Sequence, residues 1–219
     1  MTNRAWTCIL FDLDGTITDS APGITSSLAW MFERLDLPVP SPEALLGYVG
    51  PPLLDSFRDF AGFSESEAWD ALTLYRSHYL DRGLYDSSVY PGMPDVLAKV
   101  AASSLPMSLA TSKPETPANL ILGHFDLARH FDVIAGASDD ESRSSKADVV
   151  ADALRRLALA GADISRPVLV GDREHDVHGA AAHGVPTIFV EWGYGAEHEQ
   201  VGSHSVARTA AELPGLLLG

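Results

Sequence analysis

The sequence contains almost no cysteine: Cys8 is the single one in 219 residues, so no disulfide can form within the chain. Chains this poor in cysteine are typical of reducing compartments, and we expect a cytoplasmic protein. Cys8 lies inside the apolar run 8–11, where a thiol behaves as a small buried hydrophobic group.

Long hydrophobic runs are also missing. No apolar run approaches the roughly 18 residues that a transmembrane helix needs. The apolar stretch 6–11 is too short for a secretory signal and leads directly into acidic residues, so we expect neither a signal peptide nor a membrane partner.

Basic residues are scarce, because 15 lysines and arginines stand against 30 acidic residues and leave a formal charge of −15. Such a surface repels nucleic acid polymers and anionic membranes, and solubility alone is enough to explain it. An anionic substrate would need local positive features, such as a metal ion or helix N-termini. Nothing in the pattern demands an apolar interface, and we expect a monomer or a weak homodimer.

The chain has enough hydrophobic residues, 46%, for a sizeable core in one large domain or in a domain that carries an insert. Short apolar runs alternate with amphipathic helical patterns. We expect strands over 6–12, 107–110, 131–135, 167–170 and 187–190, and helices over 94–102, 115–123, 146–160, 176–183 and 209–217. This alternation predicts an α/β fold, a doubly wound, Rossmann-like parallel sheet with right-handed crossovers.

Residues 18–88 differ from the rest, because their apolar residues recur at helical spacing and show no convincing strand. The helical faces lie near 24–35, 53–60 and 69–79. This block interrupts the α/β pattern directly after the first strand.

We therefore expect an inserted α-helical cap over residues 17–90. The core domain would consist of residues 1–16 and 91–219, with hinges near 16–20 and 89–91.

Two carboxylates, Asp12 and Asp14, follow the first predicted strand, and Gly15 turns the chain after them. In doubly wound sheets, ligands bind beyond the carboxyl ends of the strands. Neighbouring carboxylates allow one to attack as a nucleophile while the other moves protons. Asp and Gly are also common in plain turns, so this pair alone leaves both interpretations open.

A second acidic pair, Asp172 and Asp176, follows the predicted strand 167–170. The spacing of four places Asp176 on the first turn of the next helix, facing Asp172. Together with Asp12 they form an all-oxygen set suited to Mg²⁺. Asp176 could instead simply complement the helix dipole.

Three further residues could hold a phosphate group. Thr111 and Ser112 lie between a predicted strand and a helix, where a hydroxyl and free backbone N–H groups bind phosphate oxygens, although a plain N-cap has the same pattern. Lys146 begins a helix, where a lysine is electrostatically unfavourable. Pairing with phosphate and with Asp12 would explain its position, and a solvated surface lysine is the alternative.

Two other kinds of site find no support. His175, His178 and His183 match no common zinc spacing, and the sequence has no second cysteine to join them. No Gly-x-Ser-x-Gly segment is present, so a serine hydrolase triad is not indicated.

Taken in order, these motifs resemble the haloacid dehalogenase-like (HAD) hydrolase superfamily. The resemblance covers essentially the whole chain and rests on Asp12-Leu13-Asp14-Gly15-Thr16, Thr111, Lys146 and Gly171-Asp172 with Asp176. The position of the cap is similar to that of the phosphoglycolate phosphatase and β-phosphoglucomutase branch. Segments 48–53, 110–114, 134–138 and 193–195 look closest to members described as 5′-nucleotidase-like or phosphoglycolate phosphatase-like.

The resemblance implies a Mg²⁺-dependent phosphatase that hydrolyses a small phosphorylated metabolite of the phosphoglycolate or nucleoside 5′-monophosphate type. Asp12 would become an aspartyl-phosphate, while Asp14 would act first as an acid and then as a base. The implied metal ligands are Asp12, the backbone carbonyl of Asp14, Asp172 and Asp176. The implied phosphoryl-binding residues are Thr111, Ser112 and Lys146.

The resemblance also narrows the chemistry. Asp14 argues against true dehalogenases, and the absence of lysine from residues 17–90 argues against a phosphonatase that uses a cap lysine. Gly50 and Arg58 are candidates for contacts with the leaving group, although Arg58 could equally be a surface residue. A β-phosphoglucomutase-like phosphotransferase and a non-catalytic regulatory protein are the alternatives.

One segment departs from the pattern. Asp140-Glu141-Ser142 stands where the resemblance leads us to expect Asp-Gly-Thr. We therefore expect the loop before Lys146 to differ in shape or in charge.

Overall fold

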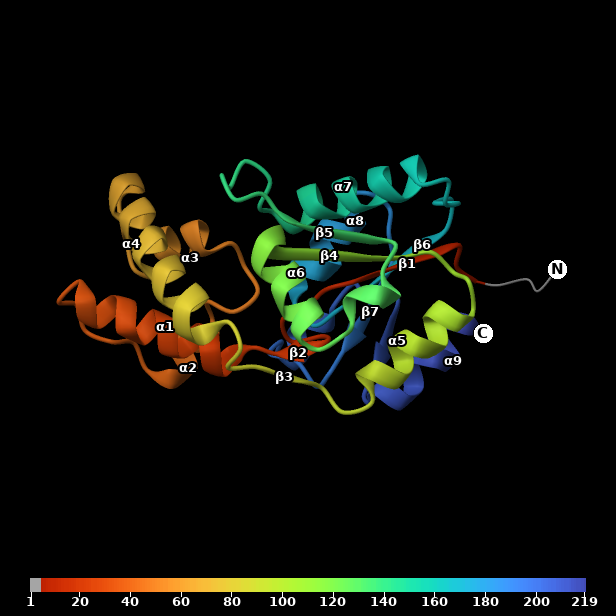
Figure 1. The fold of residues 1–219 in the computed structure, drawn as a ribbon, viewed down its shortest axis with the longest axis horizontal. Helices are drawn as coiled ribbons and strands as arrows, with labels where there is room; N and C mark the ends of the chain where they lie inside the picture. The colour runs from red at the N-terminus through yellow and green to blue at the C-terminus, as the bar shows by residue number, and fades with distance from the viewer. Residues whose placement is uncertain (1–4) are drawn as a thin grey trace.

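A parallel sheet forms the centre of the molecule in a computed structural model that describes residues 5–219 (Figure 1). Residues 1–4, the start of the expected core segment, lie outside the described part. The sheet has six strands in the order β5-β4-β1-β6-β7-β8, and every neighbouring pair is parallel. The strands are β1 (Cys8–Phe11), β4 (Met107–Pro114), β5 (Val133–Ala137), β6 (Pro167–Gly171), β7 (Thr187–Val190) and β8 (Ser205–Ala207). The predicted α/β fold is confirmed.

Helices cover both faces of the sheet, and β1 is buried on both sides. Ile9 and Phe11 pack with the cluster under α5 (Met93–Ala102), α6 (Glu115–His124) and α9 (Leu213–Leu218). Cys8 and Leu10 belong to a second cluster, under α7 (Lys146–Leu159) and α8 (Glu174–Ala181). Side chains alternate between the two faces of a strand, so a central strand buried on both faces reads as a continuous apolar run.

The predicted strands of the sheet are present, but β8 was not predicted. It has three residues, two of them half-buried, and such a short edge strand leaves no periodic signal. The last predicted helix is also shorter than expected. A 3₁₀ turn, η4 (Ala210–Glu212), precedes α9, and two further 3₁₀ turns are η2 (Ala128–His130) and η3 (Glu197–Gln200).

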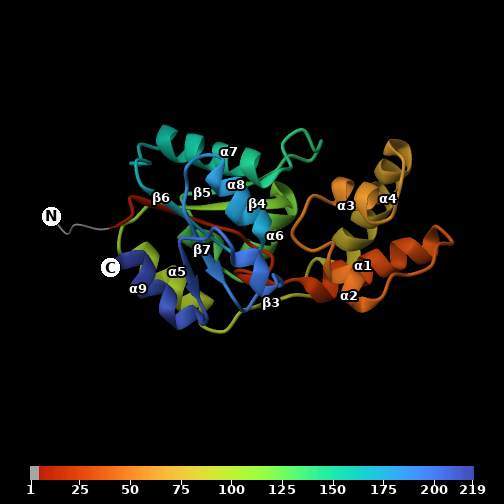
Figure 2. The same ribbon diagram turned by 180° about the vertical axis from the view of Figure 1, so that it is seen from behind.

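Four α-helices gather at one end of the molecule, away from the sheet (Figures 1 and 2). They are α1 (Ala21–Arg34), α2 (Pro42–Leu46), α3 (Leu53–Asp59) and α4 (Glu65–His78), and a π-helical turn, η1 (Tyr79–Gly83), continues α4. The backbones of α1 and η1 touch: a Cβ on Gly23 would lie 2.0 Å from the Gly83 carbonyl oxygen. Helix α2 was not predicted, since five residues are too few to show a periodic face.

The two connections between the helical end and the sheet pair with each other. β2 (Thr18–Asp19) and β3 (Ser88–Val89) are antiparallel, with Thr18 opposite Val89. The expectation of no strand within 18–88 was wrong here, because a two-residue strand has no detectable period. No helix in the described part of the chain is long and apolar enough to cross a membrane.

Candidate active site

Three buried carboxylates meet at the carboxyl edge of the sheet. Asp12 follows β1, Asp172 follows β6, and Asp176 lies in the first turn of α8. One carboxylate oxygen from each lies within 4.8 Å of the others. The strand-end positions that the sequence indicated therefore do bring these acids together.

Lys146, the first residue of α7, lies among them. Its Nζ is 2.7 Å from Asp12 Oδ1 and 2.7 Å from Asp176 Oδ1, and it donates a hydrogen bond to the Ala110 carbonyl at 3.0 Å. Burial opposes the charged form of this lysine, but Asp12 and Asp176 outweigh it and raise the Lys146 pKa above its usual value. Lys146 is thus a buried ammonium at the centre of the cluster.

The pKa values of Asp12 and Asp172 are raised despite this lysine. Burial raises the pKa of Asp12 to about 6, with Lys146 pulling it down and Asp176 pushing it up. Burial, and then the charges of Asp176 and Asp12, raise the pKa of Asp172 well above its usual value. Three acids and one lysine leave an excess of negative charge that a bound cation would offset.

The donor set fits a divalent metal ion. Among the described residues, neither Asp12 Oδ1 nor Asp176 Oδ1 accepts a well-aligned hydrogen bond, although Lys146 Nζ is close to both. Hydrogen bonds fix the third acid, since Thr16 Oγ1 donates to Asp172 Oδ1 at 3.0 Å and the Tyr194 N–H donates to Oδ2 at 2.8 Å. Buried carboxylate oxygens are the ligands that Mg²⁺ prefers.

Glycines allow the backbones of two loops to lie very near the Asp172 carboxylate. A Cβ on Gly15 would lie 2.2 Å from Asp172 Oδ2, and a Cβ on Gly193 would lie 2.4 Å from the same oxygen. Gly15 also has a φ of +87°, which favours glycine. Any side chain at either position would displace this carboxylate.

Tyr194 connects this cluster to the helical end. Its backbone N–H binds Asp172, as described above, and its hydroxyl binds the end of β2 and the start of α1. The hydroxyl accepts hydrogen bonds from the Ser20 N–H at 2.7 Å and the Ala21 N–H at 3.0 Å, and donates to Asp19 Oδ1 at 2.9 Å.

Asp14 has a different environment from the other acids. Its carboxylate is 2.9 Å from Lys113 Nζ, and both side chains are almost fully buried. Lys113 Nζ also lies over the Tyr79 ring, 4.8 Å from its centroid. The Asp14 carboxylate is not one of the three clustered acids, so any part for Asp14 in metal binding would involve its backbone carbonyl.

Sequence reasoning did not assign a role to Lys113 or Tyr79. A usable signal existed for the lysine, because the chain has lysine only at 99, 113 and 146. A lysine directly after Thr111 and Ser112, the two candidates for phosphate binding, was therefore unusual in this sequence. Tyr79 showed only the spacing of an ordinary helical face.

Thr111 is buried near the end of β4, and its Oγ1 accepts a hydrogen bond from the Lys113 N–H at 3.2 Å. Strand β4 continues to Pro114 with an irregular register after Thr111, and α6 begins at Glu115. The sequence suggested that Thr111 and Ser112 lie at the start of a helix, but in the structure both lie within β4. The two carboxyl-terminal residues Lys113 and Pro114 separate them from α6.

Gly50 and Arg58 lie in different surroundings. Gly50 lines a cavity that begins at Asp14, and its φ of +109° favours glycine. Arg58 is on the surface, with 40% of its side chain exposed, and pairs with Asp55 and Glu65. It is not among the described residues that line the cavity, because α3 turns it toward its acidic neighbours.

A family model described as haloacid dehalogenase-like hydrolase matches residues 9–190, which include the acids, Lys113 and Lys146. The chain belongs to the haloacid dehalogenase-like hydrolases. Its fold agrees, since a protein described as a predicted phosphatase from Clostridium acetobutylicum superposes with a TM-score of 0.90 at 35% identity, covering 96% of this chain and 97% of that one.

Curated relatives of this HAD hydrolase carry different names. A 5′-nucleotidase of Pseudomonas aeruginosa is 38% identical over 208 residues, covering 95% of this chain and 92% of that protein. A protein named tyrosine-protein kinase PtkA, from Mycobacterium tuberculosis, is 46% identical over 187 residues. That match covers 85% of this chain but only 62% of PtkA, so the HAD hydrolase spans less than two thirds of that relative.

We expect the metal-free hydrolase to lose stability as the pH rises through the range set by Asp12. Its pKa in the folded state, about 6, exceeds the ordinary value of 3.8, so the folded state holds the proton more tightly than the unfolded state. The stabilising contribution is complete below pH 3.8 and is lost as the pH rises through about 6. A bound cation must displace this proton, so Mg²⁺ should stabilise the protein more above the range than below it.

Thermal unfolding with Mg²⁺ or with a chelator, at pH values on either side of this range, measures the effect. The Asp12→Asn variant is the control and should have a flatter profile. An equal Mg²⁺ stabilisation on both sides of the range would contradict the expectation.

Proposed function

We propose that this HAD hydrolase is a Mg²⁺-dependent phosphatase that acts on a small phosphorylated metabolite through an aspartyl-phosphate on Asp12. The single observation that carries the proposal is the position of Asp12. It lies at the end of β1, 2.7 Å from the ammonium of Lys146 and within 4.8 Å of two further carboxylates. The 38% identity to the protein named 5′-nucleotidase supports a small phosphorylated substrate.

In the first step an oxygen of Asp12 attacks phosphorus, and the bond from phosphorus to the ester oxygen breaks. The leaving alkoxide takes a proton from Asp14, which lies two residues along the same turn. In the second step Asp14 takes a proton from water, and this water attacks phosphorus. The bond to Asp12 breaks, and inorganic phosphate and the free carboxylate are formed.

The other residues position and neutralise the phosphoryl group. Thr111, the Ser112 N–H and Lys146 would hold its oxygens, since charge neutralisation and in-line positioning account for most catalysis of phosphoryl transfer. Asp12, Asp172, Asp176 and the Asp14 carbonyl would hold Mg²⁺. When bound, this ion supplies positive charge beside the attacking carboxylate and the phosphoryl oxygens.

The helical end, residues 17–90, would act as a cap on a core of residues 1–16 and 91–219. Three contacts support this division of roles, because each joins the helical end to the edge of the sheet that carries the acids. Arg173 Nη1 donates to the Val49 carbonyl, Arg76 Nη1 donates to the Asp139 carbonyl at 3.0 Å, and Tyr194 binds Ser20 and Ala21. A closed cap would exclude water and contact the leaving group.

The test is release of inorganic phosphate from a panel of phosphate monoesters with Mg²⁺. We expect turnover that falls at least about 100-fold when a chelator removes the metal. Conversion of a sugar 1-phosphate to its isomer without free phosphate would favour the phosphotransferase alternative. No turnover of any ester would favour a non-catalytic protein.

A further inference from the structure

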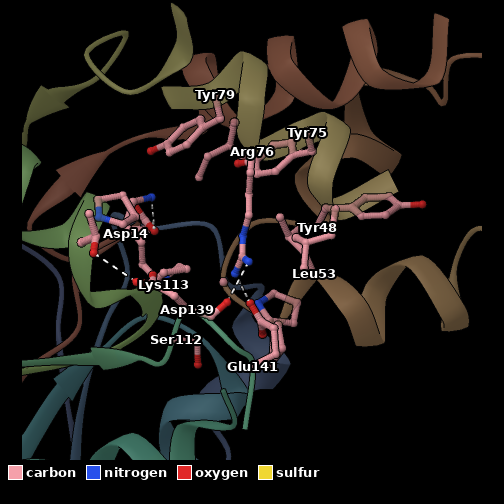
Figure 3. A pocket seen from close by; sticks show the side chains of 18 of the residues that line it. Asp14, Tyr48, Leu53, Tyr75, Arg76, Tyr79, Ser112, Lys113, Asp139 and Glu141 are labelled. Carbon is pink, nitrogen blue, oxygen red and sulfur yellow. Dashed lines mark hydrogen bonds and ion pairs between the residues drawn. The ribbon is translucent and has the colours of Figure 1, made fainter. Parts of the chain in front are cut away.

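A cavity of about 330 Å³ lies between the helical end and the sheet and begins at Asp14 (Figure 3). Its walls come from α4, η1 and the loop 48–53 on one side, and from residues 112–117 and the loop 138–145 on the other. In the proposed function Asp14 gives its proton to the leaving alkoxide. The following inference rests on that function, and places the leaving group in this cavity.

Most of the lining is aromatic or apolar. Tyr75 and Tyr79 stack at 5.4 Å between ring centroids with planes 11° apart, and they form one wall (Figure 3). The other apolar lining residues include Ile24, Tyr48, Leu53, Leu72 and Leu80. Flat hydrophobic walls favour a ring over a short polar chain, because a ring buries more apolar area against them.

The hydroxyl of Tyr79 is left without a partner. Tyr79 is only 4% exposed, and its Oη has no hydrogen-bond partner among the described residues. In Figure 3 the hydroxyl points to the side of the cavity that holds Asp14 and Lys113. A buried hydroxyl without a partner is costly, so a polar atom of a bound molecule would stabilise it.

Each cationic side chain of the cavity lies beside an acidic one. Among the described residues that line it, the cationic ones are Lys113 and Arg76. Lys113 pairs with Asp14 at 2.9 Å, and Arg76 pairs with the carboxylate of Glu141. Glu141 and Asp139 both line the cavity, so a leaving group that carries its own carboxylate would meet negative charge beside the paired Arg76.

The partner of Arg76 comes from the segment that departs from the family pattern. Glu141 has a φ of +59°, so the loop keeps a left-handed backbone at the position where the resemblance led us to expect glycine. What the glutamate adds is a charge at the end of Arg76. Burial raises the pKa of Glu141, while Arg76 opposes that shift.

We propose that this hydrolase selects phosphate esters whose leaving alcohol carries an uncharged planar ring. The ring lies against the Tyr75–Tyr79 wall, and a polar atom of the leaving group accepts or donates a hydrogen bond at Tyr79 Oη. Nucleosides and aromatic alcohols share this chemistry. Small acids such as glycolate lack the ring and carry the charge that the cavity disfavours.

The test compares kcat/KM for benzyl phosphate, ethyl phosphate, phosphoglycolate and a nucleoside 5′-monophosphate, all with Mg²⁺. The four alcohols are similar leaving groups, so differences in kcat/KM reflect how the cavity recognises each of them. We expect the ring-bearing esters to exceed ethyl phosphate by about tenfold or more, and phosphoglycolate by at least as much. A preference for the nucleotide over benzyl phosphate indicates a nucleoside, and the reverse indicates an aromatic alcohol.

Acetyl phosphate distinguishes failure of the proposal for the cavity from failure of the proposed function, because its small leaving group departs without a proton. If acetyl phosphate turns over but phosphoglycolate equals or exceeds the ring-bearing esters, the proposal for the cavity is overturned and the proposed function stands. If acetyl phosphate and every ester are inert, the proposed function fails, and this inference fails with it.

Tyr79→Phe removes the hydroxyl and keeps the ring. We expect kcat/KM for the nucleoside 5′-monophosphate to fall about fivefold more than kcat/KM for acetyl phosphate. Tyr85→Phe removes the hydroxyl of an exposed tyrosine that does not line the cavity, and it should leave this ratio unchanged. An unchanged ratio in a folded Tyr79→Phe protein would rule out the hydrogen bond.

Discussion

Replacing Asp12 by asparagine is expected to lower kcat by roughly 10⁴-fold or more, because the amide is not a nucleophile toward phosphorus. The fold should survive, since the two side chains have nearly the same volume and Asp12 is 4% exposed at the end of a fully buried strand. In chelator the variant should be at least as stable as the parent at neutral pH. The reason is that it removes one of three crowded buried charges.

Phosphate release and thermal unfolding of the same preparation check both parts of this expectation. Asp70→Asn, at an exposed position on α4, is the matched control and should change neither quantity. Undiminished turnover in a folded Asp12→Asn protein would refute an aspartyl-phosphate on Asp12.

Replacing Lys146 by methionine should have the largest effect on stability. Its Nζ is 2.7 Å from both Asp12 and Asp176, and its side chain is 5% exposed. Without it, the cluster would contain three buried carboxylates and no cation. Removal of one member of a buried ion pair costs about 3–5 kcal/mol, so the metal-free variant should unfold at much lower urea concentration.

Mg²⁺ should restore part of this loss, because a cation that binds only the folded state stabilises it by mass action. Activity should stay low even with metal, since the phosphoryl oxygens would lack the ammonium. Urea unfolding with chelator and with Mg²⁺ measures the restoration. Lys99→Met, at an exposed lysine, is the matched control. A metal-free Lys146→Met protein as stable as the parent would contradict the expected role of this ion pair.

The sheet and the acid cluster were accessible from the sequence for one physical reason. Central parallel strands are buried on both faces, so they read as unbroken apolar runs, and the residue after each run lies at the carboxyl edge. Asp12 and Asp172 each follow such a run, and the spacing of four turns Asp176 back toward Asp172. The strand-end positions and this helical spacing together predicted that the three acids would be close together.

The cavity was much harder to predict, because its residues come from segments that no repeating pattern connects. Lys113 reaches Asp14 from β4, and Arg76 reaches Glu141 from α4 across 65 positions of sequence. Arg58 shows the opposite difficulty. Its place on an amphipathic helix was clear, but the nearby Asp55 and Glu65 decide where its guanidinium lies. Such pairings depend on the angle between packed helices, which residue spacing does not encode.

The tyrosine that joins Asp172 to the chain after β2 has a mechanical consequence. Its hydroxyl has both lone pairs and its proton engaged by Ser20, Ala21 and Asp19, while its own backbone holds the carboxylate. Strands β2 and β3 connect the helical end to the rest of the chain and pair with each other, and Tyr194 binds this pair at Asp19. Any displacement of this strand pair would therefore break the hydrogen bonds of the Tyr194 hydroxyl or move the backbone N–H that holds Asp172.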